Sequence, residues 1–204
     1  MRTFNFIAAV SSLLFALLGC ASVTPTQELR SGYAIFDIKP GPDATSASIA
    51  EAVKVALQAN LSQVRIEYGI PPSPLPDKAP RFQLSSPFKG SRLEALAAAS
   101  GQSLQVANCE GAILTAHGGN TSMRQYGEGS TYFACLMPYQ GGYALNIYTT
   151  FSKASGAFNT QTLAATLMRP VVGDSADLIP RTISQIVEGV KKTGSTVTLV
   201  EAYP

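Results

Sequence analysis

Two β-prone stretches, STYFACLM at residues 130–137 and YALNIYTTF at residues 143–151, lie on either side of Gly141-Gly142 and carry the clearest structural signal in this chain. Both are rich in aromatic and β-branched residues, which favour strands. A glycine pair between two such stretches is typical of a hairpin turn. We therefore predict a β-hairpin over residues 130–151, with Cys135 in its first strand.

The remaining elements place strands and helices around this hairpin. Residues 33–38 and 63–68 have strand patterns, and Ser48 and Glu51 form a capping box for a helix over residues 48–60 between them. A unit of this kind is expected to place its two strands parallel in one sheet, whether or not they are adjacent. Further strands are expected at 81–84, 102–106, 111–115 and 196–200, and further helices at 91–101, 159–170 and from Ser175 or Pro180 to 194.

This succession predicts a single α+β domain over residues 33–204, with a mixed β-sheet and helices packed mainly on one face. The length of 204 residues suits one domain with a sizeable core. Residues 69–80 hold five prolines and form a connector with polyproline-II character. A rigid surface loop is the expected role of this connector, and a recognition site for a partner is the alternative.

The first 19 residues have the pattern of a signal peptide. Arg2 precedes an apolar run from Phe6 to Leu18, and this run ends in the sequence Leu17-Leu18-Gly19-Cys20. The run is too short to cross a bilayer of about 30 Å as a helix, which indicates a cleaved targeting segment rather than an anchor.

Residues 1–21 resemble the N-terminal segment of bacterial lipoproteins, which ends in such a lipobox. The resemblance implies that Cys20 becomes the first residue and carries a diacylglycerol and a further acyl chain, which together anchor a protein stably in a membrane. Because Ala21 and not aspartate follows Cys20, it also implies the outer membrane, with the domain facing the periplasm. Residues 20–32 then form a tether between the lipid and the domain. The alternative is an ordinary cleaved signal, in which Cys20 is incidental.

The other two cysteines, Cys109 and Cys135, form an even pair in a chain that is expected to be exported. In an oxidising compartment they should form a disulfide, which would link the hairpin to the segment around Cys109. A metal site or a catalytic thiol is the alternative, but a metal site needs three or four ligands and the chain has one histidine.

The sequence holds no recognisable catalytic motif and predicts no cofactor or metal. Any mechanism with a histidine base must use His117, which has no nucleophile elbow near it. Glu110, Asp174 and Asp177 are candidate carboxylates for glycan cleavage, although Asp174 also suits a helix start. A formal net charge of +2 gives no electrostatic footprint for nucleic acid.

Five tyrosines between residues 126 and 148 form either alternating core and rim positions of the hairpin or a contact surface for another envelope protein or a saccharide. They are Tyr126, Tyr132, Tyr139, Tyr143 and Tyr148. The anchor and the lack of a catalytic motif favour a non-enzymatic binding or assembly component of the cell envelope, with a protein partner. The alternatives are an envelope hydrolase acting on cell-wall glycan or peptide, and a periplasmic module for a small ligand or lipid.

Overall fold

The computed structural model describes residues 26–93, 95, 105–121, 128–155 and 175–203. Within these residues the chain forms one six-stranded sheet in the order β2-β5-β6-β7-β1-β8, a two-stranded sheet of β3 and β4, and two helices. The strands of the large sheet are β1 (Thr26–Lys39), β2 (Gln63–Tyr68), β5 (Leu114–Asn120), β6 (Glu128–Tyr139), β7 (Gly142–Ser155) and β8 (Thr196–Tyr203). The other elements are β3 (Gln83–Ser85), β4 (Val106–Asn108), α2 (Ser46–Asn60) and α5 (Ser175–Lys191).

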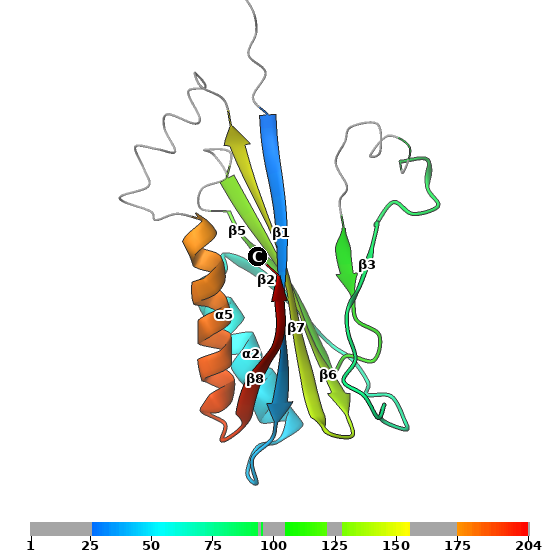
Figure 1. Cartoon of the computed structure of the whole chain (residues 1–204), viewed down its shortest axis with the longest axis vertical. Coiled ribbons are helices and arrows are strands. Elements are labelled where there is room, and N and C mark those ends of the chain that lie inside the picture. The colour runs from blue at the N-terminus through cyan, green and yellow to red at the C-terminus, as the bar shows by residue number, and fades with distance from the viewer. Residues whose placement is uncertain (1–25, 94, 96–104, 122–127, 156–174, 204) are drawn as a thin grey trace, which may run out of the picture.

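This arrangement confirms the predicted single α+β domain, and both described helices lie on one face of the large sheet (Figure 1). The expectation of a mixed sheet is wrong, because each pair of neighbouring strands is antiparallel. The strand–helix–strand unit at the start of the domain is nevertheless as predicted. Three strands separate β1 from β2 in an antiparallel sheet, so these two strands are parallel without being adjacent.

The predicted hairpin is confirmed as β6 and β7, which pair from Glu128 and Lys153 to Tyr139 and Gly142. The turn consists of Gln140 and Gly141, one residue earlier than the glycine pair suggested. Gly142 has a φ of 139°, and a Cβ atom there would lie 2.3 Å from the carbonyl oxygen of Ile38. The second glycine is therefore required by the close approach of β1.

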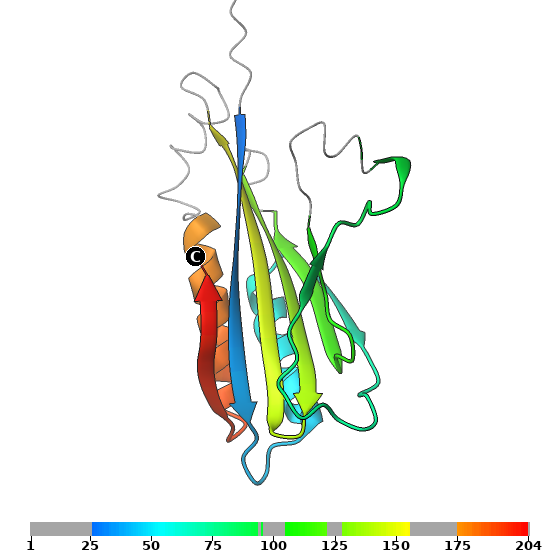
Figure 2. The same ribbon diagram turned by 45° about the vertical axis from the view of Figure 1, so that its right-hand side comes forward.

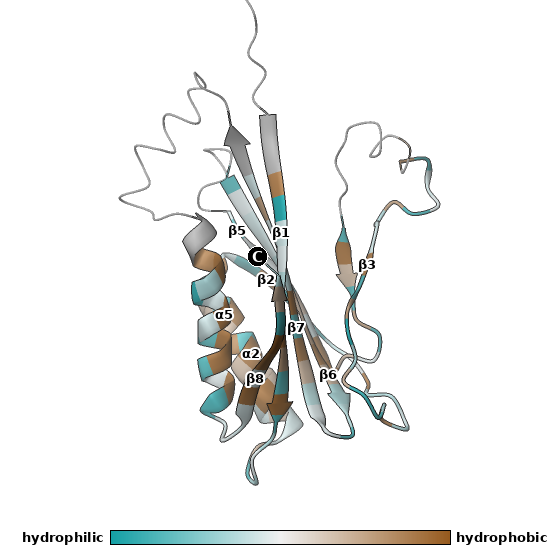
Figure 3. Ribbon diagram, viewed as in Figure 1, coloured by the Kyte–Doolittle hydropathy of each residue, from teal (hydrophilic) through white to brown (hydrophobic). Residues whose placement is uncertain are grey.

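The main core lies between the large sheet and the two helices. On α2, the predicted apolar face is buried at Ile49, Val53, Ala56 and Leu57. The capping box is one turn earlier than expected, since Thr45 is the N-cap and exchanges side-chain hydrogen bonds with Ser48 at 3.0 and 3.1 Å. Figure 3 shows the apolar sides of both helices turned toward the sheet.

The last helix takes the longer of the two predicted forms, because α5 begins at Ser175 and contains Pro180. β1 begins at Thr26, so the residues after position 25 belong to a strand and not to the predicted tether. The signal segment with Cys20 lies outside the described residues, as do the predicted helix at 159–170 and most of the one at 91–101.

The face of the sheet opposite the two helices, which we call the open face, is partly covered by the chain itself. The disulfide between Cys109 and Cys135 is present, with a Cα–Cα distance of 6.1 Å, and it joins the segment after β4 to β6 as predicted. Both cysteines pack with Ala112 and Met137 in a small second core. The connector at 69–80 then crosses this face near the hairpin turn (Figure 2), where the Gln140 amide donates to the Pro76 carbonyl at 2.9 Å.

Candidate binding face

Aromatic residues from five neighbouring strands form one row across the open face. Strand register places His117 on β5 opposite Phe133 on β6, and Phe133 opposite Tyr148 on β7. Tyr148 is opposite Tyr33 on β1, which is in turn opposite Tyr203 on β8. Neighbouring strands are about 4.8 Å apart, so these five residues, which we call the aromatic row, extend over about 19 Å.

Most neighbouring rings of this row contact one another. His117 stacks on Phe133 with 4.3 Å between ring centroids, and Tyr33 stacks on Tyr203 at 5.9 Å. Phe133 and Tyr148 are 6.2 Å apart. Aromatic pairs in such geometries contribute about 0.5–1.5 kcal/mol each beyond the area they bury. The ring contacts therefore form two groups, His117 with Phe133 and Tyr148 on one side and Tyr33 with Tyr203 on the other.

Phe82, which follows the connector, covers the middle of the row. Its ring lies 5.8 Å from Tyr33 and 5.8 Å from Tyr148, and Tyr148 is only 4% exposed. Both ends of the row stay accessible, since His117 is exposed and Tyr203 is 60% exposed. The open face thus presents two aromatic ends on either side of a covered centre.

An ionic cluster holds Phe82 in this position. Arg81 donates to Glu201 of β8 at 2.5 Å, and the Tyr33 hydroxyl donates to the other oxygen of the same carboxylate at 2.5 Å. The hydrogen bonds from Tyr33 and Arg81 hold the pKa of the Glu201 carboxyl below its ordinary value of 4.5. The bond to Glu201 raises the pKa of the Tyr33 phenol above its ordinary value of 10.0. Glu201 is therefore ionised at neutral pH and joins the chain after the connector to β1 and β8.

The tyrosines named from the sequence do not form one surface. Tyr132 is 1% exposed on the helix side of the sheet, and burial raises the pKa of its phenol, a rise that nearby Thr182 and Ser130 hydroxyls partly offset. Tyr143 is half-buried against the main core. Tyr132 therefore cannot belong to a contact surface in this conformation, while Tyr148 lies in the covered middle of the row. Tyr126 lies outside the described residues.

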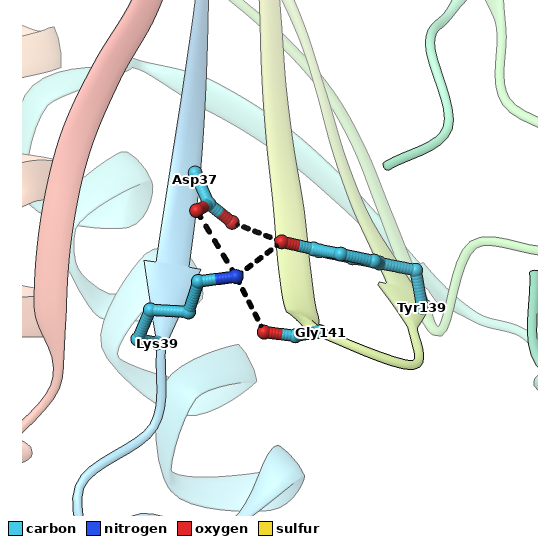
Figure 4. A network of polar contacts seen from close by, with 4 residues as sticks. All are labelled: Asp37, Lys39, Tyr139 and Gly141. Atoms are coloured by element: carbon cyan, nitrogen blue, oxygen red, sulfur yellow. Dashed lines mark hydrogen bonds and ion pairs between the residues drawn. The ribbon is translucent and has the colours of Figure 1, made fainter. Parts of the chain in front are cut away.

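Tyr139 is engaged within the domain, in a cluster at the hairpin turn (Figure 4). Its hydroxyl donates to Asp37 at 2.5 Å and accepts from the Lys39 ammonium at 2.6 Å, and Lys39 also donates to the Gly141 carbonyl at 2.6 Å. The hydrogen bond to Tyr139 and the carboxylate of Asp37 raise the pKa of Lys39. These hydrogen bonds fasten β1 to the hairpin turn.

The residues considered for hydrolysis have separate surroundings. His117 lies in the middle of β5 and stacks on Phe133, and Glu110 is exposed in the turn after Cys109. Asp177 lies in the first turn of α5, and Asp174 is outside the described residues. In the described part of the chain, no group of three or more histidine, cysteine or acidic side chains could hold a metal ion.

The described part of the chain has no helix long and apolar enough to cross a membrane. Comparison of the whole chain with protein-family models and with curated proteins finds no match.

Sequence reasoning missed most of the aromatic row. The predicted hairpin contains Phe133 and Tyr148. Had the two turn residues been placed correctly, the register of the hairpin would have put these side chains opposite each other. Tyr33 and Tyr203 join them only through the pairing of β1 with β7 and β8, which are far apart in sequence. The pairing of these distant strands had no signal in the sequence.

Proposed function

We propose that this protein is a non-enzymatic binding component of the bacterial cell envelope, anchored in the outer membrane through acylated Cys20, and that it contacts a partner protein with its open face. The observation that carries the proposal is the aromatic row, whose two ends are exposed. Tyrosine and phenylalanine are enriched in protein interfaces, because a ring contributes a large apolar area and little conformational entropy is lost when it is held.

The short N-terminal segment supports this role by limiting where the domain can act. Five residues separate Cys20 from the start of β1 at Thr26, so the link spans at most about 20 Å when extended. β1 itself, with 14 residues, is about 45 Å long. The domain would therefore stand with the start of β1 near the membrane and with the Lys39 end directed away from it.

Quantitative mass spectrometry of cross-linked envelopes tests the proposal. Wild-type protein should recover one partner in stoichiometric amount, and Cys20→Ala should lose both labelling by palmitate and most of this recovery. Tyr203→Ser should reduce recovery at least about ten-fold, the effect expected when an aromatic residue that anchors an interface is truncated. Tyr68→Ser is the matched control, because Tyr68 is 63% exposed but lies on the other edge strand.

Recovery of no stoichiometric partner by the wild-type protein would overturn the proposal. Equal losses of partner recovery with Tyr203→Ser and Tyr68→Ser would show that the open face is not the surface that contacts the partner.

A further inference from the structure

Strand β8 forms one edge of the six-stranded sheet. Within the described residues its only neighbouring strand is β1. An edge strand leaves the N–H and C=O groups of its outer side without a strand partner, and an added extended chain can satisfy them. The opposite edge of the same sheet is β2, which provides an internal comparison.

The two edges differ in the features that discourage strand addition. β2 has six residues and carries Arg65 and Glu67, whose side chains are 80% and 67% exposed. Pro71 and Pro72 follow the strand after two intervening residues. Charges and prolines of this kind protect an edge. β8 has eight residues and contains no lysine, arginine or proline. Its side chains at Leu199, Val200 and Tyr203 are 55%, 57% and 60% exposed.

The one charged residue of β8 does not protect its edge. Glu201 is held by Tyr33 and Arg81, so its charge is matched within the domain. β8 has one irregularity, because Ile35 pairs with Glu201 and Phe36 with Leu199, which leaves Val200 as an additional residue. A bulge is one of the features that can blunt an edge, but Leu199 and Val200 at this bulge are adjacent, apolar and exposed. Figure 3 shows the apolar character of β8.

We propose that β8 binds an extended, uncharged segment of another envelope protein, which adds to the sheet as an antiparallel seventh strand. This inference rests on the proposed function and names the chemistry of the partner at the same site. The added strand would lie beside Tyr203, the exposed end of the aromatic row, and would extend the open face. Its residues would be β-branched or aromatic, since such side chains fit an exposed apolar strand surface.

Anchor geometry argues against a second copy of this chain as the occupant. In an antiparallel pairing of two β8 strands, the two-fold axis is perpendicular to the sheet, so the two copies point in opposite directions. Their lipid anchors would then lie at opposite ends of strands about 45 Å long, beyond the reach of a link of about 20 Å. An unrelated segment has no such constraint.

Hydrogen exchange measured by mass spectrometry tests the proposal with the full-length acylated chain. The two samples are envelope membranes from cells that express the chain, and the same chain purified in detergent. Exchange in residues 196–203 should be at least about ten-fold slower in the membranes than in detergent, because added strand hydrogen bonds protect backbone amides. Exchange in residues 63–68, at the other edge, should be the same in both samples.

Val200→Lys should abolish the slower exchange, because a lysine on an edge strand opposes strand addition. Val55→Lys is the matched control, since Val55 is 53% exposed but lies on α2. The wild-type comparison does not depend on the folding of either variant.

Three results would overturn the proposal: equal exchange of residues 196–203 in both samples, equal protection of both edges, or protection reproduced by an excess of the purified chain alone, which would identify a second copy as the occupant. If a partner is recovered from cross-linked envelopes while β8 stays unprotected, this inference fails and the proposed function stands.

Discussion

The disulfide between Cys109 and Cys135 is the feature whose contribution to stability can be calculated most directly. We expect the double variant Cys109→Ala, Cys135→Ala to lose about 3.5 kcal/mol of unfolding free energy. The two cysteines are 26 residues apart. In the chain-entropy model, a cross-link that closes a loop of this length removes about 12 cal/mol/K from the unfolded state, which gives the stated free energy at 25 °C.

Alanine is the appropriate replacement because Cys135 is 4% exposed in the second core with Met137 and Ala112. A serine hydroxyl at this position would add the cost of an unpaired buried polar group. Urea denaturation followed by circular dichroism measures the loss, and thermal melting should show a decrease of about 7–14 °C for a chain of this size. Wild-type protein treated with reductant should show a similar decrease. A loss below about 1 kcal/mol in both measurements would refute the reasoning.

Three further predictions concern the core and the polar clusters. Leu145→Ala should lower the unfolding free energy by about 2–5 kcal/mol, because Leu145 is fully buried in β7; a smaller change in urea denaturation would contradict its place in the core. Tyr139→Phe should cost about 1 kcal/mol by removing the hydroxyl that links Asp37 and Lys39, with an unchanged melting temperature as the opposing result. Glu201 has a lowered pKa, so its stabilising effect is present above its unfolded-state pKa and disappears as the pH falls through the folded-state value. Glu201→Gln should therefore lose less stability than wild type between about pH 5 and pH 3, and parallel pH profiles would contradict this.

Local patterns in the sequence were sufficient for the elements whose partners are close along the chain. The hairpin of β6 and β7 followed from two β-prone stretches around Gly141-Gly142, and β2 from the alternation at residues 63–68. The disulfide followed from the number of cysteines and the expected compartment. In each case the information was contained in a short segment or in a simple count.

Patterns were insufficient where distant strands meet. The expectation of a mixed sheet failed because no local pattern showed that β5, β6 and β7 lie between the parallel strands β1 and β2, so that every neighbouring pair in the sheet is antiparallel. β1 was expected to begin at Tyr33, but it pairs with β7 from Thr26 onward. Polar residues before Tyr33 had suggested a tether, and the pairing with the long β7 overrides that local signal.

The candidate site shows the same limit. Tyr132 and Tyr148 were grouped because they are close in sequence, yet they lie on opposite faces of the sheet, since side chains alternate along a strand. The residues that complete the aromatic row, Tyr33 and Tyr203, are at opposite ends of the domain sequence. Only the register of β1 with its two neighbours brings them together.

Photo-cross-linking in living cells tests the role of the open face most directly. A p-benzoylphenylalanine is placed at Tyr203, at the exposed end of the aromatic row, or at Tyr68, which is as exposed but lies on the opposite edge strand. Our account predicts that position 203 cross-links to one envelope protein, in a yield at least about ten times that from position 68. Equal yields from the two positions, or cross-links from position 203 scattered over many proteins, would contradict it.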